Sequence, residues 1–109
     1  RMSADIETQR LVLYRDLFVR ERCNGRSTSA MLAALIEAWP GKLEREKLIA
    51  AVWPDPRYRA MIAEPDATIA VLASRLRQDL KPLGWTIPPV YGGQYATDRR
   101  YGLARVAAP

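Results

Sequence analysis

The sequence predicts one mainly α-helical domain with a small β-hairpin near its C-terminal end. A length of 109 residues is enough for one hydrophobic core and too short for two domains. Apolar residues recur at helical spacing between residues 27 and 81. Residues 85–106 instead combine strand formers with paired prolines and glycines, which is typical of a hairpin of two or three strands.

Residues 1–26 are predicted to form an N-terminal extra element, for which a helix is favoured over a hairpin. Charges at helical spacing and a stop signal at Asn24-Gly25 favour the helix. Asn-Gly is also a hairpin signal, and residues 11–14 and 17–19 put apolar groups on all sides of a helical wheel. Such a helix must be covered on more than one side, so this element is a candidate homodimer contact.

Three further helices are predicted at residues 27–39, 43–53 and 66–81, and a proline follows each of them. The first begins at potential N-caps, residues 27–29. The segment from Pro54 to Pro65 is predicted to be a long ordered loop or a loop with one short turn. The third helix has one apolar face that must be buried, consisting of Ile69, Leu72, Ala73, Leu76 and Leu80.

Three helices followed by a hairpin describe a winged helix-turn-helix over residues 27–109, with the hairpin as the wing. In this architecture the third helix is packed on its apolar face and its opposite face can enter the major groove of DNA. That face carries Ala67, Ala70, Val71, Ser74, Arg77, Gln78 and Lys81. The side chains in the first half of this face are small enough for the helix to approach base edges and thymine methyl groups. Those in the second half can donate hydrogen bonds to bases or phosphates. We therefore expect this stripe to read double-stranded DNA.

The charge distribution agrees with a polyanionic partner. Lys and Arg number 17 against 12 Asp and Glu, for a net charge of +5. Fourteen of the 17 are arginine, which suits phosphate and guanine recognition, although a GC-rich genome produces the same enrichment. The excess lies in residues 1–26 and 66–109. Arg99 and Arg100 at the hairpin tip are candidates for a minor groove, with a solubilising tip as the alternative.

The absence of histidine excludes serine triads, Cys/His dyads and His-ligated zinc. Cys23 is the only cysteine, which excludes an all-cysteine metal site and fits a reducing compartment. Gly92-Gly93 lacks the lysine and the following helix of a phosphate loop. We therefore expect no enzymatic activity, no cofactor and no metal. No apolar stretch is long enough to span a membrane, so we expect a cytoplasmic, nucleoid-associated protein.

Two stretches resemble the OmpR/PhoB-type winged helix-turn-helix domain of bacterial transcription regulators. Residues 43–53, LEREKLIAAVW, are similar to the family's second helix with its final Val-Trp pair, and residues 67–80, ATIAVLASRLRQDL, are similar to its recognition helix. Residues 90–95, VYGGQY, add a weaker likeness, and the resemblance covers roughly residues 28–103. It implies a wing that reaches the minor groove and a loop from Pro54 to Pro65 that touches RNA polymerase or a neighbouring protomer. It also implies that five residues lie at or near DNA: Thr68, Ser74, Arg75, Arg77 and Gln78.

We thus expect a sequence-specific double-stranded DNA-binding transcription regulator. Because the length leaves no room for a receiver domain, a stand-alone or phage-type regulator is expected. The alternative is a protein–protein interaction module on the same scaffold, with RNA polymerase or another regulator as its partner. The candidate DNA-contacting residues are Thr68, Ala70, Val71, Ser74, Arg75, Arg77, Gln78, Lys81, Arg99 and Arg100.

Overall fold

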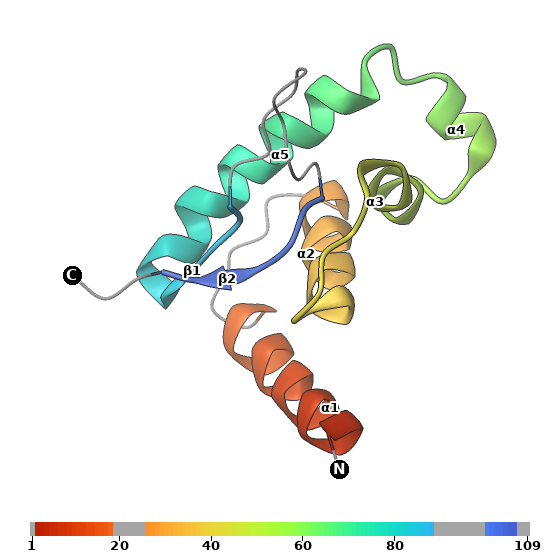
Figure 1. The fold of residues 1–109 in the computed structure, drawn as a ribbon. Coiled ribbons are helices and arrows are strands. Elements are labelled where there is room, and N and C mark those ends of the chain that lie inside the picture. The colour runs from red at the N-terminus through yellow and green to blue at the C-terminus, as the bar shows by residue number, and fades with distance from the viewer. Residues whose placement is uncertain (1, 19–25, 89–99, 107–109) are drawn as a thin grey trace.

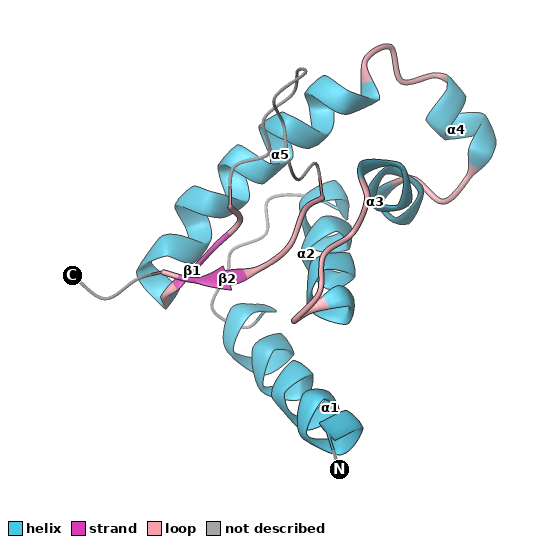
Figure 2. Ribbon diagram, viewed as in Figure 1, coloured by secondary structure: helices cyan, strands magenta, loops and turns pink. Residues whose placement is uncertain are grey.

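The computed structural model describes residues 2–18, 26–88 and 100–106. It is mainly helical, with one small two-stranded antiparallel sheet in the described part, as the predicted fold class requires (Figures 1 and 2). In chain order the elements are α1 (Met2–Leu13), the π-helical turn η1 (Tyr14–Phe18), α2 (Arg26–Ala38), α3 (Arg45–Val52), α4 (Pro56–Ala60), α5 (Pro65–Leu80), the 3-10 turn η2 (Lys81–Leu83), β1 (Trp85–Thr86) and β2 (Ala104–Arg105).

The N-terminal segment is a helix, the favoured of its two predicted forms. α1 continues into η1, and the side chains of Leu13 and Leu17 are buried in the core. The Nε of Arg10 donates a hydrogen bond of 2.9 Å to the carbonyl oxygen of Trp39, which ties α1 to the end of α2. Leu11 keeps 69% of its surface exposed, and the homodimer contact expected of this element stays a prediction. The Asn24-Gly25 signal lies outside the described residues.

The helices α2 and α3 differ from their predicted bounds at their first residues. α2 begins at Arg26, so the expected caps at residues 27–29 lie inside its first turn. α3 begins at Arg45, two residues later than predicted, and Glu44 precedes it in an extended conformation. The cause is Leu43, whose backbone is held by another segment of the chain and is not free to enter the helix.

Leu43 and Tyr101 form an antiparallel bridge that the sequence did not predict. The N–H of each donates to the carbonyl oxygen of the other, and both N–O distances are 2.7 Å. β1 and β2 pair antiparallel with Trp85 opposite Arg105. Residues 101–105 therefore run from a contact with the α2–α3 connection to a contact with β1. This segment connects the loop between α2 and α3 to the strand that follows α5.

The segment between α3 and α5 contains the short helix α4, in agreement with the prediction of a loop with one short turn. Asp55 caps α4 by accepting a 2.9 Å hydrogen bond from the N–H of Arg57. The guanidinium of Arg59 donates a 3.1 Å hydrogen bond to the carbonyl oxygen of Trp53. The bond from Arg59 fixes the segment against the end of α3, at one extremity of the molecule (Figure 1).

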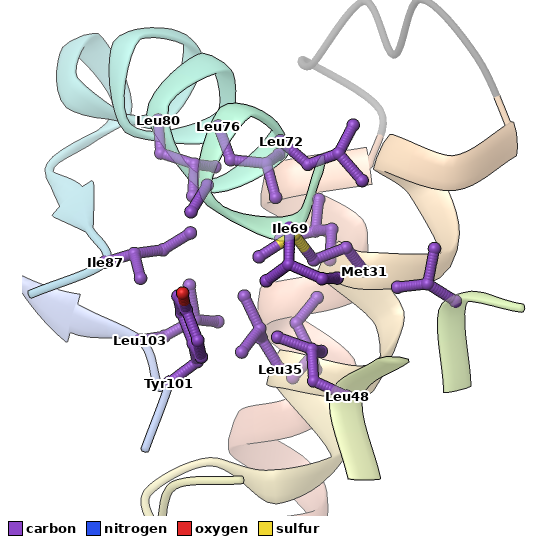
Figure 3. Close-up of a cluster of buried hydrophobic side chains, with 14 of the residues drawn as sticks. Met31, Leu35, Leu48, Ile69, Leu72, Leu76, Leu80, Ile87, Tyr101 and Leu103 are labelled. Atoms are coloured by element: carbon purple, nitrogen blue, oxygen red, sulfur yellow. The ribbon is translucent and has the colours of Figure 1, made fainter. Parts of the chain in front are cut away.

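α5 crosses the molecule as its longest described helix, and its buried face is the predicted one: Ile69, Leu72, Ala73, Leu76 and Leu80. Figure 3 shows Leu76 and Leu80 directed toward Ile87 on the strand side, and Ile69 beside Met31 of α2. Trp85 is buried and its ring meets that of Trp39 edge to face, with centroids 5.9 Å apart. This packing leaves the opposite face of α5 uncovered by the described chain. None of the described helices combines the length and apolar character needed to cross a membrane.

Candidate nucleic-acid interface

The face of α5 opposite the core carries small and uncharged side chains along its centre. Ala67, Ala70, Val71, Ser74 and Gln78 are all exposed, and Val71 retains half of its surface. At about 100° per residue these five positions form one continuous stripe along the helix. Lys81 is exposed just beyond them, at the first residue of η2. The structure therefore brings together most of the predicted DNA-contacting residues.

Arg75 and Arg77 lie on opposite sides of this stripe. Because they are two residues apart on the helix, their side chains leave it about 160° apart. Arg75 is exposed and faces α2, where it lines a shallow cavity of about 180 Å³ with Thr28, Gln78 and Asp79. The stripe is thus bounded by a guanidinium on each side.

Arg77 is half-buried, whereas the sequence placed it on the exposed stripe. Its Nε donates a hydrogen bond to the carbonyl oxygen of Ile87, in the chain that leaves β1. The position of Arg77 on the helix is intermediate between the buried and exposed faces, and β1 passes on that side. Arg77 therefore has a structural partner that helical periodicity alone does not reveal.

Thr68 lies at the edge of the stripe in the first turn of α5. Its hydroxyl donates a 2.9 Å hydrogen bond to the carbonyl oxygen of Glu64. The backbone N–H of Thr68 donates to the same oxygen at 3.0 Å. The hydroxyl is thus engaged with the start of the helix, which gives Thr68 a local role besides the one implied by resemblance.

Arg100 is exposed and lies beside the N-terminal ends of α3 and α5, not at the C-terminal end of α5. There it lines a cavity of about 410 Å³ together with Glu44, Arg45, Glu46 and Asp66. The guanidinium of Arg45 pairs with the carboxylate of Asp66 at 2.9 Å and connects the two helix ends. Arg99 and the predicted hairpin tip lie outside the described residues.

The sequence reasoning missed Thr86 and Arg105, which border the stripe on the strand side. They line a cavity of about 420 Å³ with Arg77, Gln78, Lys81 and Val106. The guanidinium carbon of Arg105 lies 4.8 Å from the centroid of the Trp85 ring, in a cation–π contact. No sequence signal identifies Arg105, because its position depends on the strand register that places it opposite Trp85.

Neither metal geometry nor likeness to known proteins indicates a function. Within residues 2–18, 26–88 and 100–106, no group of three or more histidine, cysteine, aspartate or glutamate side chains could hold a metal ion. No family model matches the chain, and no match is found among curated proteins or solved structures. The functional conclusion therefore depends on the geometry and charge around α5.

Proposed function

We propose that the chain is a sequence-specific double-stranded DNA-binding transcription regulator and that α5 is the recognition helix of a winged helix-turn-helix. The order of its elements supports this architecture. α2, α3 and α5 are the three core helices, and β1 and β2 form the base of the hairpin that follows them. The bridge between Leu43 and Tyr101 adds a third extended segment next to this hairpin.

The observation that carries the proposal is the stripe of small side chains between Arg75 and Arg77. A helix with its side chains is about 10–12 Å across, and the major groove of B-DNA is about 12 Å wide. A helix in the groove therefore has base edges in front of it and a phosphate backbone on each side. Small residues at the centre and a guanidinium on each flank are what such a position requires.

The stripe also offers chemically distinct contacts along its length. Ala70 and Val71 can contact thymine methyl groups, and Ser74 can donate to or accept from several bases. Gln78 has the amide that pairs with adenine in two hydrogen bonds. Since these contacts differ from one another, the surface supports reading of a defined sequence in preference to general attraction to DNA.

Selection of duplexes from a random library by the purified chain tests this proposal. We expect an enriched sequence, and Ala70→Glu should weaken binding to it at least about 100-fold, because a carboxylate placed among base acceptors and phosphates costs several kcal/mol. The matched control is Ala50→Glu, at an exposed alanine of α3, which should bind within about twofold of the unmodified chain. Absence of any enriched sequence, or equal losses in both variants, would contradict the proposal.

Exposed apolar side chains near α4 favour a second candidate function, contact with a protein partner such as RNA polymerase. Tyr58 is 58% exposed and Met61 is 81% exposed, at the extremity occupied by α4 (Figure 1). Aromatic and methionine side chains are enriched in protein interfaces. If this surface binds purified polymerase, Tyr58→Ser with Met61→Ser should weaken that binding at least tenfold. Leu11→Ser, on the exposed side of α1, is the control that should not.

A further inference from the structure

A cavity of about 430 Å³ lies where the C-terminal end of α1 approaches the strands (Figure 1). Apolar side chains form most of its described lining: Val12, Leu13, Leu17, Trp39, Leu83 and Trp85. The polar side chains of Gln9, Asp16 and Arg105 complete this lining. Sites for small molecules have volumes of about 300–1,000 Å³ and combine apolar walls with a few polar groups. The cavity has both properties of such a site.

The floor of the cavity is apolar and its polar groups lie at the mouth. Leu13, Leu17 and Trp85 are buried, whereas Gln9 and Arg105 are exposed and Asp16 is half-buried. Burial of apolar surface against such a floor is favourable, and a polar group at the mouth stays in contact with water. The cavity therefore suits a ligand with an apolar body and one polar head.

Arg105 is held at the mouth by its contact with Trp85. These two residues are directly paired across β1 and β2, so their side chains lie on the same face of the sheet. The guanidinium carbon lies 4.8 Å from the centroid of the Trp85 ring, and that ring packs edge to face on Trp39. A guanidinium stacked on a ring keeps its in-plane N–H groups available for an acceptor. Arg105 therefore presents an ordered set of donors to a ligand head.

The charges at the mouth favour an anionic head. Asp16 is the one carboxylate in the described lining, and its Oδ1 lies 3.3 Å from the Nε of Arg15 in an ion pair. Within the described part of the chain, no carboxylate pairs with Arg105. A carboxylate is the head that matches this cation, because a guanidinium can bind it through two parallel hydrogen bonds.

We propose that this cavity binds a small carboxylic acid with an apolar body. The body lies against Leu13, Leu17 and Trp85, and the carboxylate accepts hydrogen bonds from Arg105. The amide of Gln9 can donate a further hydrogen bond to the carboxylate. The cavity shares no residue with the exposed stripe of α5, so this site goes beyond the proposed function and does not depend on it.

Titration of the purified chain with octanoate tests the site, with the indole N–H groups followed by NMR. The chain has three tryptophans, of which Trp39 and Trp85 line the cavity and Trp53 does not. We expect saturable shifts of the Trp39 and Trp85 signals, with a dissociation constant of about 0.01–1 mM, and no shift of the Trp53 signal. Absence of a saturable shift, or equal shifts of all three signals, would overturn the proposal.

Octylamine and two arginine variants test recognition of the carboxylate. Octylamine has the same chain with a cationic head, and repulsion from Arg105 should make it bind at least about fivefold more weakly than octanoate. Arg105→Gln should weaken octanoate binding about three- to tenfold, because a charge-assisted hydrogen bond at an exposed mouth is lost. Arg57→Gln removes the same charge at an exposed side chain of α4 and should stay within about twofold. Equal losses in both variants, or octylamine binding as tightly as octanoate, would overturn the site.

A second pair of variants keeps the test independent of the packing of Arg105 on Trp85. Val12→Glu adds a carboxylate to the lining at a side chain 38% exposed, and should weaken octanoate binding at least about tenfold. Leu11→Glu adds the same charge at a side chain 69% exposed and outside the described lining, and should stay within about threefold. Octanoate binding by Val12→Glu that equals that of the unmodified chain would contradict the proposed position of the ligand.

Discussion

Arg77 of α5 donates a hydrogen bond from its Nε to the carbonyl oxygen of Ile87, ten residues further along the chain. Ile87 follows β1 and its side chain is fully buried, so this bond connects the helix to the start of the hairpin segment. The side chain that the sequence pattern assigned to DNA is therefore also an internal support of the proposed interface. Its substitution is therefore expected to lower stability as well as the proposed DNA binding.

Arg77→Ala is expected to lower the free energy of unfolding by about 1.5–3 kcal/mol, because a hydrogen bond from a charged donor to the Ile87 carbonyl is lost. Urea denaturation followed by circular dichroism measures this change. Arg77→Lys keeps the charge but not the guanidinium, so it should lose similar stability while retaining most of the salt dependence of DNA binding. Unchanged stability in both variants would show that the bond contributes nothing to the fold.

Leu76→Ala should lower mainly stability, and Val71→Ala should lower mainly DNA binding, although both residues lie on α5. Leu76 is fully buried at the centre of the core, and its truncation is expected to cost about 2–5 kcal/mol in thermal or urea unfolding. Val71 is 50% exposed, so its truncation should change stability by less than about 0.5 kcal/mol. Val71→Ala should instead weaken binding to a selected DNA site that contains thymine. A large loss of stability in Val71→Ala would contradict the exposure of this face.

Gly102→Ala is expected to destabilise the fold by about 1–3 kcal/mol through overpacking. A Cβ at this position would lie 2.7 Å from the Cγ of Lys42 and 3.2 Å from the carbonyl oxygen of Gly41. The double variant Lys42→Ala with Gly102→Ala removes the closer of these contacts and should recover part of the loss relative to Lys42→Ala alone. Strictly additive losses in this cycle, measured by urea denaturation, would show that the close contact is not the cause.

Tyr14 of η1 makes the stability of its contact with α2 sensitive to alkaline pH. Burial raises the pKa of Tyr14 to about 12, and its hydrogen bond to Glu37 and the charge of that carboxylate act in the same direction, while Arg10 opposes them. A tyrosine with a raised pKa in the folded state contributes stability that is present below pH 10 and is lost as the pH rises toward 12.

Tyr14→Phe should therefore be less stable than the unmodified chain at pH 7, and the difference should shrink by pH 11. Urea denaturation at the two pH values measures it. A difference that is constant with pH would mean that the phenol keeps its ordinary pKa of about 10 in the folded state.

The helices that build the core were predictable because each presents one apolar stripe to it. Ile69, Leu76 and Leu80 recur at helical spacing in α5, and a single core buries them together. The N-terminal segment was ambiguous, because its apolar residues point in all directions around a helix. The structure resolves this by burying Leu13 and Leu17 and leaving Leu11 exposed.

The strand contacts could not be predicted, because they are too short to produce a pattern. Leu43 is a single bridged residue in what reads as a connection between two helices. Arg105 gains its position from pairing with Trp85, a relationship between residues far apart in the sequence. Periodicity describes one element at a time and cannot show which side chains two elements bring together.

The bridge between Leu43 and Tyr101 also has a consequence for the order of folding. It joins backbone positions 58 residues apart (43 to 101), and closing a long loop costs more entropy than forming a helical turn. Contacts of this kind slow folding, so we expect α2, α3 and α5 to dock before the strands pair. During synthesis, α5 emerges before residues 101–105, so the helix proposed to read DNA can form before the strand contacts that complete the fold. A chain that ends before residue 101 would therefore contain the proposed recognition helix without the strand pairing that follows it in the complete fold.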